Sequence, residues 1–329
     1  MAKIKIENSF IWVILMAIRI YSANFLKLCW YMLFPVLGQV LGLLLVFCLA
    51  GWFSVYLPQL AEKYRMFDDF TTIILCILLL TIPGLLIFTK AFWEYLVAYG
   101  AINSVTESYL TTGKIYDYPA HKATVTKYTI RFIALWLLYS VYMSLAIIPF
   151  LWIPAAILFI YFILIFQVFS FEPEQSPVDY FTRSFVLIKG NAIRTVLIML
   201  IIGLFTHVIF VQGVAVLFDF LKITQFLGAL FEETLVTYIP IDEINNFMLM
   251  INPSFNYLTP AKVSAFLIYN VVAFLVIGFT LPLRSITWAL WYKVLREDEF
   301  KKSTKQTKKK VVKRISPEIM DRANRKYND

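Results

Sequence analysis

Six long apolar runs constrain the fold of this chain more than any other feature of its sequence. Each run is close to the roughly 20 residues that an α-helix needs to cross about 30 Å of hydrocarbon. Helices are predicted because a spanning segment must satisfy its backbone hydrogen bonds internally. The predicted spans are residues 30–55, 71–91, 130–149, 152–169, 196–217 and 264–282. The sequence therefore predicts an all-α, multi-span membrane protein.

Composition excludes a soluble globular fold for the body of the chain. Hydrophobic residues make up 60% of the 329 residues and charged residues only 16%, whereas a soluble protein has about 25% charged residues. The three cysteines, Cys29, Cys48 and Cys76, lie in or beside apolar runs and have no metal-ligand spacing. We interpret them as small apolar core residues.

Residues 176–194 form a polar-capped amphipathic segment between two spans. Ser176 and Pro177 are typical of a helix start, and Gly190 and Asn191 are typical of a helix end. One helical stripe of this segment contains Val178, Phe181, Phe185 and Ile188. The pattern indicates an amphipathic helix in the plane of the membrane, with a soluble connector helix as the alternative.

The N-terminal residues 1–28 contain a similar segment before the first span. A secretory signal peptide is disfavoured, because Arg19 and Lys27 follow the apolar stretch closely and no small-residue cleavage pattern is present. We expect an uncleaved interfacial helix here. Two interfacial helices thus precede the first and fifth spans.

An offset of 167 residues aligns Ser9 with Ser176 and Asn24 with Asn191. The alignment predicts an internal repeat of two three-span halves, each begun by an interfacial helix. Chance similarity in an apolar sequence is the alternative. The proposed halves are residues 8–170 and 175–296.

Loop charges predict the orientation of the chain. Residues 57–70 carry a net charge of −1 and residues 218–262 a net charge of −3, whereas the alternate loops are rich in Lys and Arg. The positive-inside rule therefore predicts that both termini are cytoplasmic. We expect a six-span membrane domain over residues 1–296.

The C-terminal residues 297–329 are expected to form a basic cytoplasmic tail that is largely disordered. Between residues 293 and 329 there are 13 Lys and Arg against 6 Asp and Glu. A basic cluster beside a span attracts anionic lipid headgroups. Nucleic acid is not an expected partner, since no aromatic platform or folded module accompanies the charges.

Ionisable side chains near the ends of spans are candidates for a binding site. Lys90 and Glu94 are four residues apart on a predicted helix and can pair, and Arg284 lies at the corresponding end of the sixth span. A cluster of these three side chains could grip a lipid phosphate or an anionic solute. The alternative is that Lys90 and Arg284 extend to headgroups without a specific ligand.

No pattern in the sequence predicts catalysis, a cofactor or a metal ion. The chain has no His-Glu-x-x-His helix, no Gly-x-Ser-x-Gly elbow, no phosphate-binding glycine loop and no paired cysteine motif. It has two histidines, His121 and His207. We interpret His207, Gln212 and Asn270 as interhelical hydrogen-bonding groups.

The segment that ends at Asn191 resembles a motif of the membrane domain of glycerophosphoryl diester phosphodiesterases and of YciC-like inner-membrane proteins. The matching residues are Arg183, Ser184, Leu187, Lys189, Gly190 and Asn191. The resemblance extends loosely over residues 8–296, and it departs at Tyr180, where a small residue is usual, and over residues 222–262. A phosphodiesterase would need a separate catalytic barrel of about 200 or more residues, which this chain does not contain.

The resemblance implies an integral helical domain of the bacterial inner membrane with a role in envelope or lipid homeostasis. We therefore expect a non-catalytic structural or accessory protein whose partners are membrane lipids and a further membrane protein. A small-solute or lipid transporter is the alternative. Transport predicts a polar cavity near the middle of the membrane, lined by both halves.

Overall fold

The computed structural model describes residues 6–234 and 236–326, with side chains as far as Thr304 except Asp68. The described residues contain no strand. Six helical segments are long and apolar enough to cross a membrane, as the sequence predicts. They are Phe25–Lys63, Phe70–Thr112, Thr129–Ile147, Pro149–Phe171, Ala192–Phe220 and Pro260–Thr304. The chain is an all-α protein with the composition and helix lengths of a multi-pass membrane protein.

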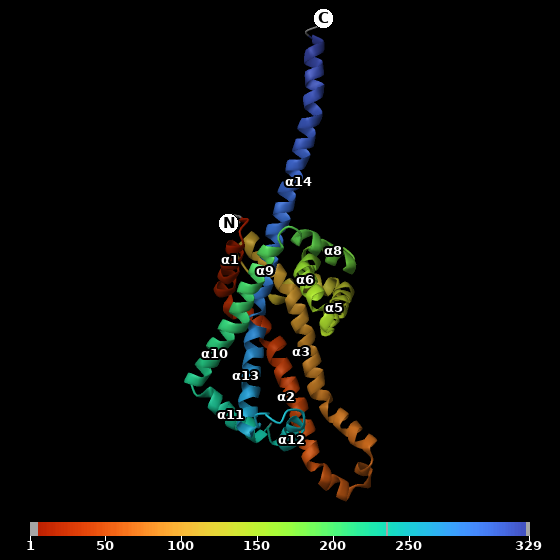
Figure 1. The fold of residues 1–329 in the computed structure, drawn as a ribbon, viewed down its shortest axis with the longest axis vertical. Helices are drawn as coiled ribbons and strands as arrows, with labels where there is room; N and C mark the ends of the chain where they lie inside the picture. Colours follow the sequence, from red (N-terminus) through yellow and green to blue (C-terminus); the bar gives the residue numbers. More distant parts are fainter. Residues whose placement is uncertain (1–5, 235, 327–329) are drawn as a thin grey trace. The chain divides into compact units, whose positions relative to one another are not determined.

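Fourteen α-helices are described (Figure 1). In chain order they are α1 (Phe10–Ala23), α2 (Phe25–Lys63), α3 (Phe70–Thr112), α4 (Tyr118–Lys127), α5 (Thr129–Ser144), α6 (Trp152–Phe162), α7 (Ile165–Phe171), α8 (Pro177–Ile188), α9 (Ala192–Gly203), α10 (Phe210–Phe220), α11 (Ile223–Thr234), α12 (Ile241–Ile251), α13 (Pro260–Phe279) and α14 (Leu281–Lys326). Short 3₁₀ turns cover Arg65–Asp68, Leu145–Ile147, Pro149–Leu151 and Val236–Tyr238, and a π-helix covers Leu204–Ile209.

The chain divides into two compact units, and neither is one of the proposed sequence halves. Unit 1 comprises residues 1–20, 103–198 and 285–329, and unit 2 comprises residues 21–102 and 199–284. Each unit draws on both halves. Four of the six candidate spans lie in residues 8–170 and two in residues 175–296. The division into two halves stays a prediction.

Helix starts nevertheless support the 167-residue offset. The starts of α1 and α8, and those of α2 and α9, are each 167 residues apart. The break before each span has the same backbone hydrogen bond: Asn24 N donates to Tyr21 O at 3.3 Å, and Asn191 N donates to Ile188 O at 2.7 Å. The repeat stays a prediction that these local geometries favour.

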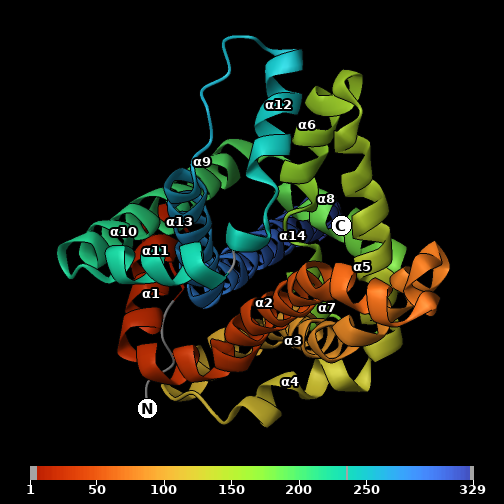
Figure 2. The same ribbon diagram turned by 90° about the horizontal axis from the view of Figure 1, so that it is seen from below.

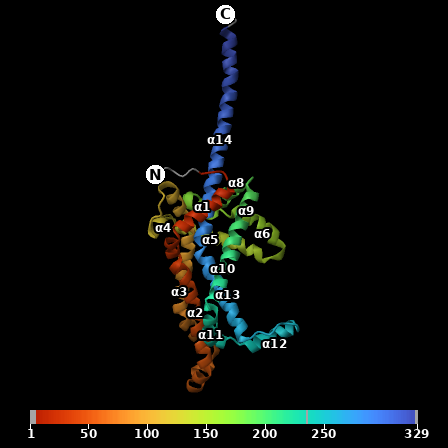
Figure 3. The ribbon, with the colours of Figure 1, turned by 90° about the vertical axis from the view of Figure 1, so that its left-hand side faces the viewer.

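Unit 2 is built on a close crossing of α2 and α3, which lie side by side in Figures 2 and 3. A Cβ atom added to Gly42 would lie 2.6 Å from Phe88 N, and one added to Gly84 would lie 2.7 Å from Gly42 O. Small residues allow two membrane helices to approach until their backbones touch. The glycines therefore set the distance between these two helices.

The segment between the last two candidate spans also belongs to unit 2 and forms α11 and α12. Helix α11 packs against α13, where Ser264 Oγ donates to Gly228 O at 2.9 Å. Helix α12 runs across the direction of α13 in Figure 3. Within α12, the amide of Asn245 bonds both the N–H and the carbonyl of Leu258, which lies in the segment after this helix. No helix is predicted for this segment from the sequence, so α11 and α12 are findings of the structure.

Helices α13 and α14 are separated by a break at Thr280. Pro282 has no backbone N–H to continue the helical hydrogen bonds, so carbonyl groups of the preceding turn need other donors. Arg284 Nη2 donates to Ile277 O at 2.9 Å, and Tyr21 Oη donates to Phe279 O at 3.2 Å. Arg284 therefore has a structural role at the break.

Beyond the break, α14 runs as one helix to Lys326 (Figure 1). The backbone is thus helical over residues 297–326, where the sequence predicts a largely disordered tail, and residues 327–329 of the predicted tail lie outside the described residues. Lys, Arg and Glu are all good helix formers, and the tail is rich in them. Their propensity is consistent with a helix that continues past the apolar part of the chain.

Candidate functional site

Helix α8, which lies in unit 1, begins as its sequence predicts. Ser176 Oγ accepts a hydrogen bond from Asp179 N, and the Asp179 carboxylate accepts one from Ser176 N, both at 3.3 Å. This reciprocal capping box, with Pro177 at the first helical position, confirms the predicted helix start. The predicted end is also confirmed, because α8 stops at Ile188 and Gly190 adopts a φ of +87°.

The side of α8 that packs on the protein coincides only in part with the predicted apolar stripe, since Ile188 belongs to both and the ring of Phe181 lies 5.0 Å from that of Phe162 in α6. The buried residues of α8 are Tyr180, Ser184, Leu187 and Ile188. In the stripe, Val178 is 64% exposed and Phe185 is 38% exposed. Helix α8 thus packs against α5, α6 and α7, and the ring of Phe185 lies 4.7 Å from that of Tyr161 in α6. Val178 and part of Phe185 remain exposed as an outer apolar face. An interfacial helix needs such an outer apolar face to contact lipid.

Ser184 completes the hydrogen bonding of a helix break in the neighbouring span. Its Oγ donates to Tyr161 O at 2.7 Å and accepts from Leu164 N at 3.3 Å, where α6 ends and α7 begins. Ser184 is fully buried. Unpaired backbone groups at this break would otherwise be buried at a cost of several kcal/mol in an apolar environment.

Tyr180 anchors the start of α8 to the loop before it. Its Oη donates to Pro173 O at 3.0 Å and to Gln175 O at 2.9 Å. Burial raises the pKa of Tyr180 to about 12. A small residue, usual at this position in the resembling family, could not make these two hydrogen bonds.

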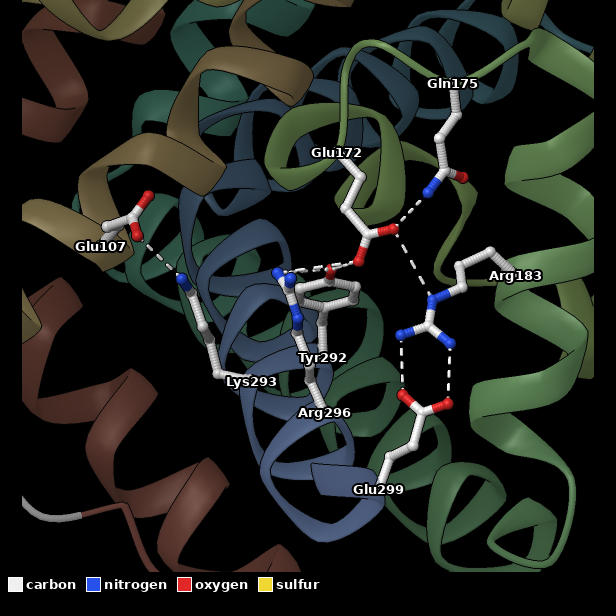
Figure 4. A network of polar contacts seen from close by, with 8 residues as sticks. All are labelled: Glu107, Glu172, Gln175, Arg183, Tyr292, Lys293, Arg296 and Glu299. Atoms are coloured by element: carbon white, nitrogen blue, oxygen red, sulfur yellow. Dashed lines mark hydrogen bonds and ion pairs between the residues drawn. The ribbon is translucent and has the colours of Figure 1, made fainter. Parts of the chain in front are cut away.

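Arg183 fastens α8 to α14 through a two-pronged ion pair (Figure 4). Its Nη1 and Nη2 atoms lie 2.8 and 2.7 Å from the two carboxylate oxygens of Glu299. Its Nε lies 3.6 Å from Glu172 Oε2. Hydrogen bonding to Glu299 holds the pKa of Arg183 above its ordinary value. Paired, parallel hydrogen bonds of this kind fix orientation as well as distance.

Glu172 is the centre of the same network. Its carboxylate accepts hydrogen bonds from Tyr292 Oη at 2.6 Å and Gln175 Nε2 at 2.5 Å, and it lies 3.6 Å from Arg296 Nη1. A further ion pair joins Lys293 to Glu107 at 2.9 Å (Figure 4). The network contains three carboxylates and three cations, so its charges balance.

A buried group of amides lies elsewhere in unit 1. Asn103 Oδ1 accepts from Gln167 Nε2 at 3.3 Å and from Ser285 Oγ at 3.1 Å, and Asn103 Nδ2 donates to Ser170 Oγ at 2.8 Å. Asn103, Gln167 and Ser285 are fully buried. None of the three is among the predicted site residues, although polar side chains inside apolar runs are a usable signal.

The remaining motif residues shape the turn between α8 and α9. Leu187 is buried, and Gly190 supplies the positive φ of the turn. Lys189 and Asn191 line a cavity of about 280 Å³ together with residues of α14. The six residues of the family-like motif thus gather around the contact of α8 with its neighbours.

The predicted cluster of Lys90, Glu94 and Arg284 is brought together only in part. Lys90 Nζ pairs with Glu94 Oε1 at 3.0 Å. Arg284 Nη1 instead lies 3.0 Å from His207 Nε2. A guanidinium can only donate, so this ring nitrogen accepts. The other ring nitrogen, Nδ1, is 2.8 Å from Thr206 Oγ1, inside the π-helix.

The interhelical roles predicted for the amides hold for one of the two residues. Gln212 Nε2 donates to Tyr269 Oη at 2.9 Å, which joins α10 to α13. Asn270 instead donates to Phe266 O of its own helix at 2.8 Å. Asn270 therefore satisfies its amide locally, in the way that polar side chains in helices often bond the carbonyl four residues earlier.

Among the described residues, no three His, Cys, Asp or Glu side chains are grouped so that they could hold a metal ion. Comparison of the chain with protein-family models, with curated proteins and with solved structures gives no match. The family resemblance of the motif around Arg183 stays a prediction.

Proposed function

We propose that this chain is a non-catalytic integral membrane protein that binds anionic lipids at the membrane surface along α8. Its role would be structural or accessory, in the organisation of membrane lipid. The observation that carries the proposal is the ion pair between Arg183 and Glu299, which holds α8 against α14. This pair keeps the outer apolar face of α8 beside basic residues of the same unit.

Two features of the surroundings support this role. Val178 and Phe185 are exposed on α8, and apolar side chains at this level favour the boundary between headgroups and acyl chains. Lys302 lies three residues after Glu299 on α14, and the basic tail continues from it. Basic residues near a membrane surface each attract anionic lipid by about 1 kcal/mol.

The proposal is tested by the lipid that stays with the protein. The purified chain is reconstituted into nanodiscs that contain equal amounts of dioleoylphosphatidylglycerol and dioleoylphosphatidylcholine, and is then extracted under mild conditions. We expect the retained lipid, measured by mass spectrometry, to be enriched several-fold in phosphatidylglycerol. Retention of the two lipids in their bulk ratio would contradict the proposal.

A second candidate is a transporter of lipid or of a small anionic solute. The observation that favours it is the contact between Arg284 and His207 in the π-helical segment of a candidate span, because π-helical turns are frequent at functional sites. An assay in proteoliposomes with fluorescent phosphatidylglycerol and a membrane-impermeant quencher distinguishes lipid transport from the accessory role. Lipid exchange between leaflets that is lost in Arg284→Gln would favour transport, and exchange no faster than in empty vesicles would favour the accessory role.

A further inference from the structure

The turn between α8 and α9 and the facing part of α14 line a half-open cavity within unit 1, which we call the turn cavity. Its volume is about 280 Å³. Its lining residues are Val186, Leu187, Lys189, Asn191, Leu295, Asp298, Glu299, Lys302 and Ser303. One part of this lining is apolar and the other part carries charged and amide groups. A ligand that fits must therefore have both an apolar and a polar side.

The cations of the turn cavity have no acidic partner, whereas its acids are engaged. Glu299 is held by Arg183 through two hydrogen bonds. Asp298 Oδ2 accepts from the amide of Asn8 at 2.5 Å. Within the described residues, the ammonium groups of Lys189 and Lys302 form neither a hydrogen bond nor an ion pair. Because the amide of Asn8 is neutral, Asp298 keeps its negative charge, and the two ammonium groups leave the cavity with an excess of one positive charge.

Asn191 adds a neutral donor to these two cations. Its backbone N–H bonds Ile188 O and its carbonyl accepts from Thr195, but its side-chain amide has no partner in the described part of the chain. The positive φ of Gly190 brings the chain round so that residues on both sides of it, Lys189 and Asn191, line the same cavity. Two ammonium groups and an amide N–H are suitable donors for a phosphate group.

A second cavity in unit 1 also contains cations, but its cations are paired with carboxylates. A larger cavity of about 570 Å³ is lined by Lys293, Arg296 and Lys301 among other residues. Each of these cations has a carboxylate within 3.6 Å, supplied by Glu107, Glu172 and Glu297 respectively. Its cations are thus paired with carboxylates, so this larger cavity should attract an anion less strongly than the turn cavity does.

The position of the turn cavity points to a lipid as the source of the phosphate. A candidate membrane span begins at Ala192, directly after Asn191. Ile193 is 79% exposed and Val186, which lines the cavity, is 49% exposed. Apolar side chains at the start of a span indicate the depth at which hydrocarbon gives way to headgroups. A phosphate at this depth belongs to a phospholipid, whose glycerol and first methylene groups would contact Val186.

We propose that the turn cavity binds the phosphate of an anionic phospholipid between Lys189, Lys302 and Asn191. This inference rests on the proposed function and adds to it a specific site. Lys189 of the turn and Lys302 of α14 provide the opposite charge, and Asn191 orients one phosphate oxygen. The Lys-Gly-Asn sequence thus has a binding role that its other contacts do not explain.

The test titrates the full-length protein in a neutral detergent with dioleoylphosphatidylglycerol and measures bound lipid by native mass spectrometry. We expect Lys189→Gln and Lys302→Gln each to weaken binding about fivefold. Lys189→Arg retains the charge and should bind as the unchanged protein does. Lys301→Gln is the matched control, since Lys301 has the same charge, is next to Lys302 and pairs with Glu297 outside the turn cavity.

Each outcome of the test has a distinct meaning. If Lys301→Gln weakens binding as much as Lys302→Gln does, only the general basic field attracts lipid and the turn cavity is not a site. If glycerol 3-phosphate competes as well as the lipid, the cavity takes a free phosphate compound and the lipid assignment is wrong. If the unchanged protein does not prefer phosphatidylglycerol to phosphatidylcholine, the proposed function itself fails.

Discussion

The crossing of α2 and α3 makes a sharp prediction for Gly42→Ala. The new Cβ would lie 2.6 Å from Phe88 N and 2.8 Å from Gly84 O, against 3.4 Å for ordinary contact. The shorter of these two contacts is about 0.8 Å too close. Both neighbouring atoms belong to the backbone of α3, so no side chain can rotate away and the helices must separate. Overpacking of this kind costs about 1–3 kcal/mol of unfolding free energy.

A matched control isolates the clash from the intrinsic preference of alanine for helices. Gly213 lies in α10, and apart from its own helical turn no atom of the described residues lies within 4 Å of an added Cβ. Gly213→Ala should therefore be neutral or stabilise by at most about 1 kcal/mol, which is the helix-propensity gain. The difference in unfolding free energy between Gly42→Ala and Gly213→Ala measures the clash alone.

The assay is reversible unfolding in mixed micelles, followed by far-ultraviolet circular dichroism as the fraction of sodium dodecyl sulfate is raised. Gly84→Ala should destabilise to a similar extent, since its Cβ would lie 2.7 Å from Gly42 O. In the double variant the helices are already apart after the first substitution, so the combined cost should be less than the sum. Equal stability of Gly42→Ala and Gly213→Ala would refute the backbone contact.

Three further substitutions test the surroundings of α8. Arg183→Lys replaces two parallel hydrogen bonds to Glu299 with a single charged contact, and we expect a loss of about 1 kcal/mol in the unfolding free energy, because both side chains are partly exposed. Ser184→Ala leaves Leu164 N and Tyr161 O without their partner and should cost about 1–3 kcal/mol. Tyr180→Phe should reduce the loss of stability at high pH: the pKa of Tyr180 is raised from 10.0 to about 12, so its contribution is fully present below pH 10 and is lost as the pH rises towards 12.

Each of these results has a control in the same unit. Lys301→Gln breaks an exposed pair and should change stability by only a few tenths of a kcal/mol, so an equal effect of Arg183→Lys would contradict the role of the two-pronged pair. Ser144 is exposed and donates to Val141 O in its own turn, so Ser144→Ala should be nearly neutral. For Tyr180→Phe, the measured quantity is the slope of stability against pH above pH 10, and an unchanged slope would show that Tyr180 ionises as readily in the folded chain as in the unfolded one.

Several features of this protein could be read from local sequence. The six candidate spans follow from the length of the apolar runs, because hydrocarbon thickness alone sets the number of residues needed. The start and end of α8 follow from Ser176 and Gly190, since capping and a positive φ depend on neighbouring residues only. The 167-residue offset between helix starts was also visible in the sequence.

Other features depend on residues that are distant in the chain. Arg183 was selected by resemblance, but its partner Glu299 is 116 residues away, and no local pattern links them. The same holds for Glu172, whose position after an apolar helix gave no indication that Tyr292 and Arg296 would meet it. The two lysines of the turn cavity also come from distant parts of the sequence. Lys189 belongs to the predicted motif, whereas Lys302 is one of many basic residues in the C-terminal part of the chain, and nothing local links the two.

By itself, then, the sequence determined how many helices this chain can place across a membrane and where α8 starts and stops, because these depend on solvent and on adjacent backbone groups. Only the tertiary structure decided which face of α8 is buried, which charges are compensated and which remain available at the turn cavity. The physical reason is that these properties arise from packing between segments far apart in sequence, where small differences in shape and distance select one pairing from many of similar chemistry.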